Sequence, residues 1–144
     1  MASATRLYTP EVLALATALA AHPFDPAMPF AGTARSPSCG STLALSLRLD
    51  EAGRIAELGL RPQACAIGQA SAAIFAAAVP GRTRADIARA EAQIAAWLAG
   101  TGPLPDWPGL GAIAAARDYP ARHGAMLLPW RAALDALATA LPTS

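Results

Sequence analysis

The sequence predicts an α+β domain in which a small antiparallel sheet of about three strands packs against about five helices. Two observations support this class. Residues 42–61 contain two alternating segments separated by a turn signal, which is typical of a β-hairpin. Segments with helical periodicity stand before and after the hairpin. The chain has 144 residues, which is enough for a single domain spanning residues 1–144 with a core of its own.

The segment before the hairpin is predicted to begin with a helix of about residues 10–21. Thr9 suits the N-cap, Pro10 suits the first helical position, and Glu11 interacts favourably with the helix dipole. The Pro-rich residues 22–37 follow, and we expect them to form an irregular excursion.

The hairpin itself is read from "STLALSLRLDEAGRIAELGLR". Leucine occupies every second position from 43 to 49, so a strand over residues 42–49 has one leucine face. "DEAG", residues 50–53, is predicted to form the turn, with Gly53 available for a positive φ. Residues 54–61 return as the partner strand, and a third strand is expected nearby.

The second half of the chain is predicted to be helical. Small apolar residues indicate a buried helix of about residues 66–79. "TRAD", residues 83–86, has the spacing of a capping box and opens a helix that reaches about residue 99. A loop precedes a short helix over residues 110–119, and a final amphipathic helix over residues 129–141 can accept Pro129 in its first turn.

Composition and charge exclude several classes of function. The net charge is +1, and the charged residues are spread along the chain, so no basic stripe for nucleic acid is present in the sequence. No apolar run reaches the roughly 18–20 residues of a membrane helix. "VLALATALAA", residues 12–21, resembles the core of a signal peptide, but only Arg6 supplies a positive charge before it. A structural helix and a cytoplasmic protein are therefore expected.

The two cysteines stand at the ends of predicted elements. Cys39 lies in a Pro-Ser-Cys-Gly turn before the first hairpin strand, and Cys65 lies where the second strand gives way to a helix. A helix N-terminus stabilises a thiolate. Because the hairpin folds back on itself, we expect both cysteines at the same end of the sheet. Two converging thiolates suit a soft metal or sulfur chemistry, and the alternative is that each cysteine is a small buried hydrophobic residue.

Nearly the whole chain resembles a known family. "SPSCGSTLALSLRLDEAGRIAELGLRPQACAIGQASAAIF" is similar to the central part of the U-type iron–sulfur cluster assembly scaffolds, namely IscU, SufU and the N-terminal domain of NifU. Their pattern is a Pro-x-Cys-Gly-Asp turn, a hairpin, and a helix that begins at a second cysteine. "RLYTPEVLALATALAAHP" resembles the opening helix of the family, and "PARHGAMLLPWRAAL" resembles its closing Pro-Ala-Arg-x-x-Cys-Ala-x-x-x-Trp pattern. The extra segment around "TGPLPDWPG" places the chain nearest to the SufU branch.

The resemblance implies an α+β scaffold of the SufE/NifU-like fold, not an enzyme. Such a scaffold carries zinc, iron or a transient 2Fe–2S cluster, receives sulfur from a cysteine desulfurase and passes the cluster to apo iron–sulfur proteins. It implies that Cys39 and Cys65 are the first two cysteine ligands. The ligand set is degenerate, because Ser41 stands in place of the family aspartate and Ala125 in place of the third cysteine.

Two residues are candidates for replacement ligands. Ser41 offers a hydroxyl, which is a poor ligand at neutral pH. His123 lies two residues before Ala125, and an imidazole can bind zinc or iron, although two residues are about half a helical turn. Arg122 matches the family's basic position and is predicted to attract a persulfide or a carboxylate, or else to be a solvated helix residue.

Three hypotheses follow from the incomplete ligand set. In the first, one chain holds metal or cluster with Cys39, Cys65 and a replacement ligand. In the second, a homodimer pools four thiolates around one cluster. In the third, cluster binding has been lost, and the protein acts as a partner or regulator of sulfur transfer or accepts a persulfide on one thiol.

Overall fold

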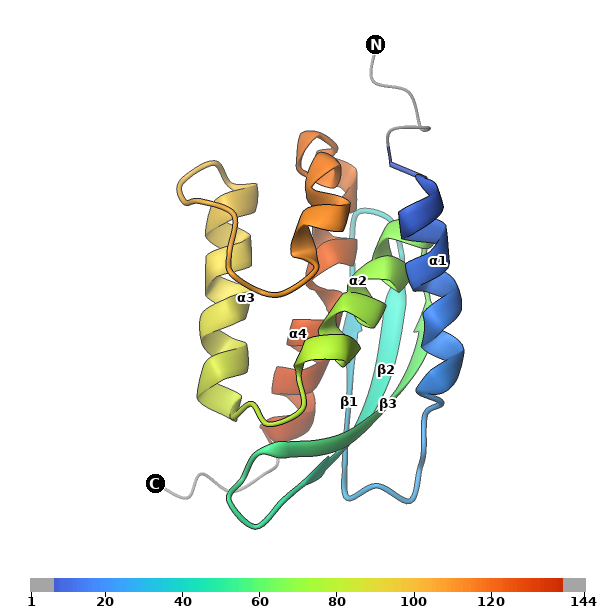
Figure 1. Cartoon of the computed structure of the whole chain (residues 1–144), viewed down its shortest axis with the longest axis vertical. Helices are drawn as coiled ribbons and strands as arrows, with labels where there is room; N and C mark the ends of the chain where they lie inside the picture. Colours follow the sequence, from blue (N-terminus) through green and yellow to red (C-terminus); the bar gives the residue numbers. More distant parts are fainter. Residues whose placement is uncertain (1–6, 139–144) are drawn as a thin grey trace.

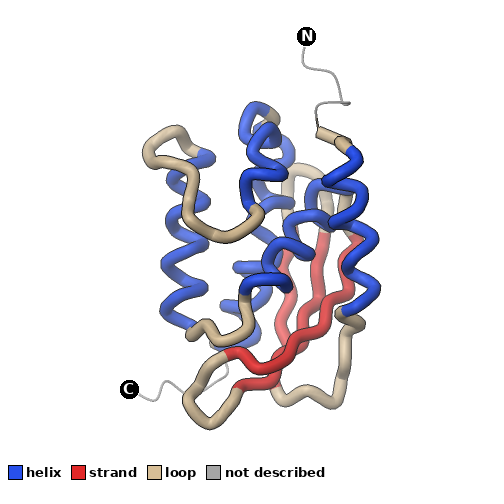
Figure 2. Tube along the Cα trace, in the orientation of Figure 1, coloured by secondary structure: helices blue, strands red, loops and turns tan. Residues whose placement is uncertain are grey.

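The structure, a computed structural model, describes residues 7–138 and has the predicted α+β class. Its one sheet has three antiparallel strands in the order β1-β2-β3. The strands are β1 (Phe30–Arg35), β2 (Thr42–Leu49) and β3 (Ile55–Gln63). The α-helices are α1 (Pro10–Ala18), α2 (Ala66–Ala78), α3 (Arg84–Leu98) and α4 (His123–Leu137), and the 3-10 segments are η2 (Leu19–Ala21), η3 (Leu110–Asp118) and η4 (Pro120–Arg122). Figures 1 and 2 show that the helices gather on one face of the sheet.

The predicted hairpin is confirmed. Leu43, Leu45 and Leu47 of β2 are buried beneath the helices, as their alternation predicts. The turn closes where the Asp50 carboxylate accepts hydrogen bonds from the backbone N–H groups of Ala52 and Arg54. The partner strand continues to Gln63, two residues beyond its predicted end, so Gln63 pairs with Thr42 at the start of β2.

The segment predicted to be irregular, residues 22–37, contains β1 and so supplies the third strand. The prediction of an excursion was wrong there because β1 depends on distant partners and not on its own composition. Gly32 lies against α4, where an added Cβ would overlap the backbone of Ala132 and Ala136. This close approach lets α4 cover β1. The residues around Gly32 in the sequence do not predict it, because the contact is with a helix about 100 positions away.

Both outer strands are tied to other parts of the chain at their free edges. On β1, the Thr33 N–H donates to the Asp135 carboxylate of α4 at 2.9 Å. On β3, the Leu60 N–H donates to the carbonyl of His22 at 2.8 Å. Helix α4, 102 positions from Thr33, therefore contacts one edge of the sheet, and the loop before β1 contacts the other edge.

The core is centred on α2, whose residues from Ile67 to Ala76 are buried except Gln69. Phe75 stacks on Trp107 with ring centroids 5.5 Å apart, and Trp130 meets both rings edge-on. The Trp107 indole donates to the Ile74 carbonyl at 3.1 Å, which fixes the loop before η3 against α2. The small residues of α2 allow these large side chains to reach it.

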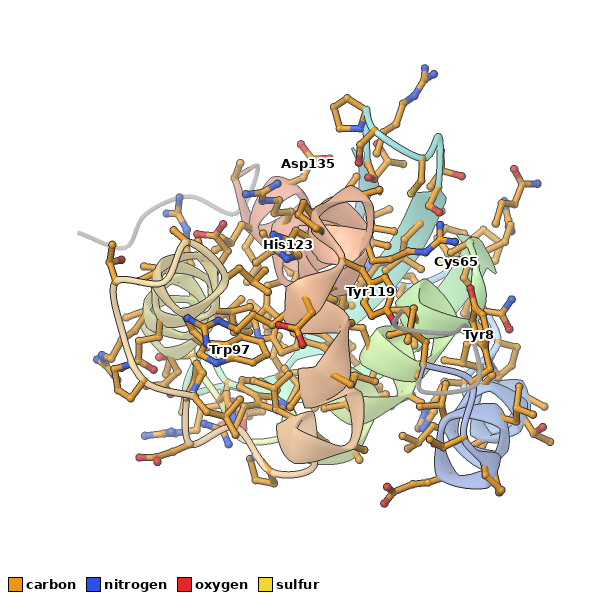
Figure 3. The ribbon with its side chains drawn as sticks, turned by 90° about the horizontal axis from the view of Figure 1, so that it is seen from above. Tyr8, Cys65, Trp97, Tyr119, His123 and Asp135 are labelled. Carbon is orange, nitrogen blue, oxygen red and sulfur yellow. The ribbon has the colours of Figure 1, made fainter. Side chains whose placement is uncertain are left out.

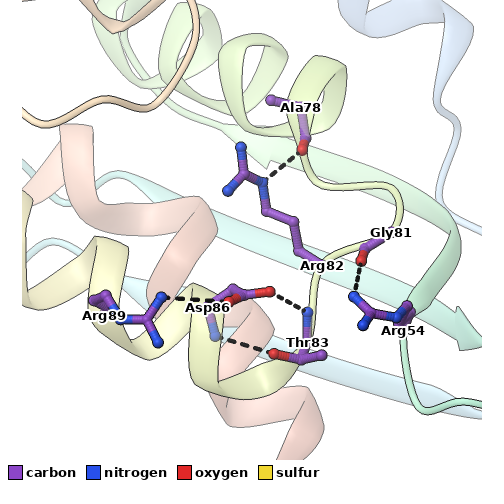
Figure 4. Close-up of polar contacts among 7 residues, drawn as sticks. All are labelled: Arg54, Ala78, Gly81, Arg82, Thr83, Asp86 and Arg89. Carbon is purple, nitrogen blue, oxygen red and sulfur yellow. Dashed lines mark hydrogen bonds and ion pairs between the residues drawn. The ribbon is translucent and has the colours of Figure 1, made fainter.

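Helix α3 begins with the capping box that "TRAD" predicts. The Thr83 side chain accepts from the Asp86 N–H, and the Asp86 carboxylate accepts from the Thr83 N–H (Figure 4). Just before it, Arg82 donates to the Ala78 carbonyl at the end of α2, and Arg54 of the hairpin donates to the Gly81 carbonyl. These contacts fix the turn between α2 and α3.

The final helix differs from its prediction, which placed its start at residue 129. Helix α4 begins at His123, and Pro129 lies inside it. Pro129 cannot donate to the carbonyl four residues earlier, which ordinarily weakens a helix. Here the residues from Ala125 to Trp130 are buried, and the Ser71 hydroxyl of α2 donates to the Met126 carbonyl at 2.6 Å. Tertiary packing therefore stabilises the turn before Pro129. The helix was also predicted to reach residue 141, and residues 139–141 lie outside the described part of the chain.

Two smaller differences concern the other helices. The first helix is α-helical only to Ala18 and ends in η2, and the short helix predicted over 110–119 is the 3-10 segment η3. Among residues 7–138, no helix combines the length and apolar character needed to cross a bilayer.

Candidate functional site

Cys39 lies in the hairpin loop that joins β1 to β2. The loop, residues 36–41, is closed by hydrogen bonds from the Ser36 N–H to the Ser41 carbonyl and from the Gly40 N–H to the Ser36 carbonyl, each 2.8 Å. Gly40 has a φ of +71°, in the left-handed region that favours glycine. The predicted tight turn is therefore present, and it leaves the Cys39 side chain half-buried.

Two serine hydroxyls lie beside the Cys39 thiol. Its Sγ is 3.1 Å from Ser41 Oγ and 3.3 Å from Ser36 Oγ. Partial burial raises the pKa of the Cys39 thiol, but its hydrogen bonds with Ser36 and Ser41 and the charge of Arg122 outweigh it, so that the pKa lies below its ordinary value. A thiolate in such surroundings is a nucleophile and a metal ligand.

Cys65 occupies the N-cap of α2, two residues after β3 ends. Its backbone is extended, and its side chain makes no capping hydrogen bond, while the Gln69 side chain holds the preceding turn by donating to the Ala64 carbonyl at 2.9 Å. Thr42 pairs with both Arg35 and Gln63, so the Cys39 loop and the Cys65 N-cap leave the same end of the sheet.

The first turn of α4 contacts both cysteine-bearing segments. An added Cβ at Gly124 would overlap Ser36 Oγ and lie 3.0 Å from Ser36 Cβ, which places α4 directly on the Cys39 loop. An added Cβ at Gly68, in the first turn of α2, would lie 3.5 Å from Ala125 Cβ. Consecutive residues of α4 thus face the Cys39 loop and the helix that Cys65 opens.

Ser41 and Ala125, which stand where the family pattern has an aspartate and a cysteine, are both buried. Ser41 is 5% exposed, and its hydroxyl oxygen accepts a hydrogen bond from the Cys39 thiol at 3.1 Å. Ala125 is fully buried against α2 and offers no donor atom. Within residues 7–138, no three His, Cys, Asp or Glu side chains come together in an arrangement that could hold a metal ion.

His123 is the first residue of α4, and its Nε2 donates to the Arg117 carbonyl at 2.7 Å. One ring nitrogen is therefore committed to the end of η3. Figure 3 shows His123 apart from Cys65 in the view from above, with Tyr119 lying between their positions.

Arg122 lies immediately before α4 and is half-buried. Its guanidinium donates to the Tyr8 hydroxyl at 3.4 Å, and its positive charge is one of the influences that lower the pKa of Cys39. The role predicted for Arg122 in attracting a persulfide or a carboxylate stays a prediction, and its contact with Tyr8 was not predicted from the sequence.

Ser36, Ser38 and Gly124 complete the site and were not predicted. The Ser38 hydroxyl donates to the Ala121 carbonyl at 3.1 Å and ties the Cys39 loop to η4. These contacts join residues more than 80 positions apart, so local patterns carry no signal for them. Only the serines on each side of "PSCG" indicate that hydroxyls surround the thiol.

Comparisons with known proteins give a consistent result. The family model described as "NifU-like N terminal domain" matches residues 20–124. The chain is similar to the N-terminal part of a nitrogen-fixing NifU-like protein from Brucella abortus, with 27% identity, a TM-score of 0.83, and 93% of this chain and 94% of that chain covered. It shares its fold with a SUF-system iron–sulfur cluster assembly scaffold candidate (FiSufU) from Fervidobacterium islandicum AW-1, with 20% identity, a TM-score of 0.81, and 94% and 99% of the two chains covered. No curated protein matches the chain.

Proposed function

Because this chain belongs to the family of NifU-like N-terminal domains, we propose that it is an iron–sulfur cluster assembly scaffold-like protein. It binds iron, zinc or a transient 2Fe–2S cluster through Cys39 and Cys65 and hands this cargo on to acceptor proteins. Sulfur comes from a cysteine desulfurase, and the cytoplasm is the proposed compartment. The protein is a carrier in this pathway and not an enzyme.

The observation that supports this proposal most is the contact of α4 with both cysteine-bearing segments. Gly124 faces Ser36 of the Cys39 loop, and Ala125 faces Gly68 in the helix that Cys65 opens. The Cys39 thiol has a lowered pKa, so it supplies a thiolate more readily than an ordinary cysteine does. Thiolates are the ligands that soft metal ions and iron–sulfur clusters prefer.

One chain supplies only two thiolates, whereas structural zinc sites and 2Fe–2S clusters take four protein ligands. Ala125 and Ser41 do not make up the difference. We therefore propose that the remaining ligands come from outside the chain, from a second copy that contributes its own Cys39 and Cys65.

The test is anaerobic reconstitution with ferrous iron and sulfide, followed by visible absorption and mass measurement in solution. We expect sulfur-to-iron charge-transfer bands in a species of twice the chain mass, and we expect Cys39→Ala and Cys65→Ala each to abolish them. A protein that binds no iron under these conditions, and no zinc when zinc is supplied instead, would end the carrier proposal.

A variant in which two substitutions add metal ligands tests whether the four positions converge. Ala125→Cys with Ser41→Asp restores the ligand types that the family pattern has at these positions. We expect this double variant to bind zinc as a monomer, because it then carries four ligands. If the double variant binds no more zinc than the natural sequence, the four positions do not converge and the proposed site is wrong.

The surroundings of Cys39 favour a second candidate function, the acceptance of a persulfide sulfur. The Cys39 thiolate would attack the outer sulfur of a donor persulfide, R–S–SH, to give Cys39–S–SH and release R–S⁻. The hydroxyls of Ser36 and Ser41 and the charge of Arg122 would stabilise the attacking thiolate. Incubation with a low-molecular-weight persulfide and intact-mass measurement tests this: one added sulfur is expected, lost in Cys39→Ala and kept in Cys65→Ala.

A further inference from the structure

The face of the sheet that is turned away from the helices is hollowed at the end where the Cys39 loop begins. The hollow has a volume of about 510 Å³, and we call it the outer groove. Figures 1 and 2 show the helices over the opposite face of the sheet. The outer groove is defined by two rows of paired residues, Arg35, Thr42 and Gln63, and Thr33, Ala44 and Arg61.

The strand register gives the outer groove its shape. Thr42 and Ala44 are on the central strand and have short side chains, so they form the floor. Arg35 on β1 and Arg61 on β3 have long side chains and form the walls. Neighbouring strands are about 4.8 Å apart and residues rise about 3.3 Å along a strand, so the Arg35 and Arg61 backbones are about 12 Å apart on the diagonal.

The next row of this face is covered by residues 23–25, which close one end of the outer groove. The Asp25 N–H donates to Ser46 Oγ at 3.1 Å, and an added Cβ at Gly59 would overlap the Pro23 carbonyl. The Arg61 guanidinium stacks on the Phe24 ring, with its central carbon 4.3 Å from the ring centroid. This stacking orders the Arg61 side chain and holds its charge on the β3 side of the groove.

The charge of the outer groove has one sign. Its charged lining residues are Arg35 and Arg61, both exposed, and its other polar lining groups are the hydroxyls of two threonines and the amide of Gln63. Asp25, on the closing segment, turns its carboxylate to the Ala27 N–H at 2.8 Å. The outer groove therefore offers two separated cations to an anionic occupant.

We infer that the outer groove is a docking site for an extended, acidic segment of a partner protein. Two acidic residues four positions apart in an extended chain are about 13 Å apart, which matches the separation of Arg35 and Arg61. A single small anion would need both guanidinium groups at one point, and the stacking of Arg61 on Phe24 opposes that convergence. Arginine also pairs with carboxylates through two parallel hydrogen bonds.

This inference goes beyond the proposed function. The outer groove lies next to the loop that holds the Cys39 thiol. Arg35 and Thr42 flank the Cys39 loop directly, since the loop is residues 36–41. A partner segment bound across these two residues would bring the rest of that partner within reach of Cys39. Docking and thiol chemistry nevertheless use different side chains, so they can be tested apart.

The test uses the full chain, labelled with ¹⁵N, and the peptide GETSTEG, which has glutamates four positions apart. Amide shifts are followed during titration at low and at high salt. We expect shifts confined to the residues of the outer groove, and weaker binding at high salt because exposed charges are screened. GQTSTQG, without charge, and GEETSTG, with adjacent glutamates, are expected to bind more weakly.

Matched variants locate the binding. Arg35→Gln and Arg61→Gln should each weaken binding of GETSTEG about threefold, and together about tenfold, as expected for exposed ion pairs. Arg84→Gln removes another exposed arginine, on α3, and should change nothing. The Cys39→Ser, Cys65→Ser double variant should bind the peptide as well as the natural sequence does, so a failure of the proposed function leaves this result intact.

Three outcomes would overturn the inference. Equal binding of GETSTEG and GQTSTQG would remove the charge argument. The same shifts with inorganic phosphate at equal concentration would indicate a site for a single anion. Groove shifts that grow with protein concentration alone would assign the surface to a second copy of this chain.

Discussion

Gly124 should be the position at which a single methyl group disturbs the thiol site most. In Gly124→Ala, the new Cβ would overlap Ser36 Oγ and lie 3.0 Å from Ser36 Cβ. The Ser36 hydroxyl can rotate away only by leaving the Cys39 sulfur, which is 3.3 Å from it. The Cys39 loop must therefore shift, or it must lose one of its hydrogen bonds.

The expected magnitude combines two opposing effects. Alanine is preferred to glycine inside a helix by up to about 1 kcal/mol. Overpacking at a close contact costs about 1–3 kcal/mol. We expect the free energy of unfolding to fall by about 1–2 kcal/mol. Loss of one hydrogen bond to the Cys39 thiolate, worth about 1 kcal/mol, should lower the reactive fraction about fivefold at a fixed pH below the thiol pKa.

Urea denaturation measures the first effect, and the rate of iodoacetamide alkylation of Cys39 in a Cys65→Ser background measures the second. Gly111→Ala is the matched control, because an added Cβ at Gly111 meets no atom within 4 Å. This control should leave the alkylation rate unchanged and should not lower the free energy of unfolding, because alanine adds helix preference there without any overlap. A Gly124→Ala protein that is as stable and as reactive as the natural sequence would show that α4 does not press on the Cys39 loop.

Three further predictions concern the thiol and the scaffold around it. The pKa of Cys39 is lowered in the folded protein, so its alkylation rate should rise with pH at a lower midpoint than in the urea-denatured chain; coincident midpoints would contradict the assigned hydrogen bonds. Thr83→Ala should lower the free energy of unfolding by about 1 kcal/mol through loss of the capping box, while Thr83→Ser should keep most of it, as urea titration can show. Gly32→Ala should cost about 3 kcal/mol or more, since the overlap is with the backbone of α4; a stable variant with native circular dichroism would disprove the close contact.

The parts of the fold that the sequence predicted correctly are those encoded locally. The leucine alternation of β2, the Asp50 turn and the Thr83 capping box each rest on residues within a few positions of one another. A third strand was predicted, but its position at β1 was missed, as were the first two turns of α4, because their causes are distant. Strand β1 packs against α4 at Gly32, where the two backbones approach closely. The turn before Pro129 is stabilised by Ser71 and the surrounding core.

The same distinction applies to the candidate site. The turn at Cys39 and the helix start at Cys65 were predicted from adjacent residues, and both are present. The hydrogen bond from Arg122 to Tyr8 and the contact of Gly124 with Ser36 join segments far apart in the sequence, so a pattern of neighbouring residues could not reveal them.

The tethered edges of the sheet bear on the behaviour of this protein at high concentration. The leucine-rich β2 would gain most from stacking on copies of itself, but it lies between two other strands. The Thr33 N–H on one edge and the Leu60 N–H on the other are already engaged within the molecule. Pairing at these edges has to break both contacts first, so we expect the rate of amyloid-like growth to follow the rate at which the domain opens.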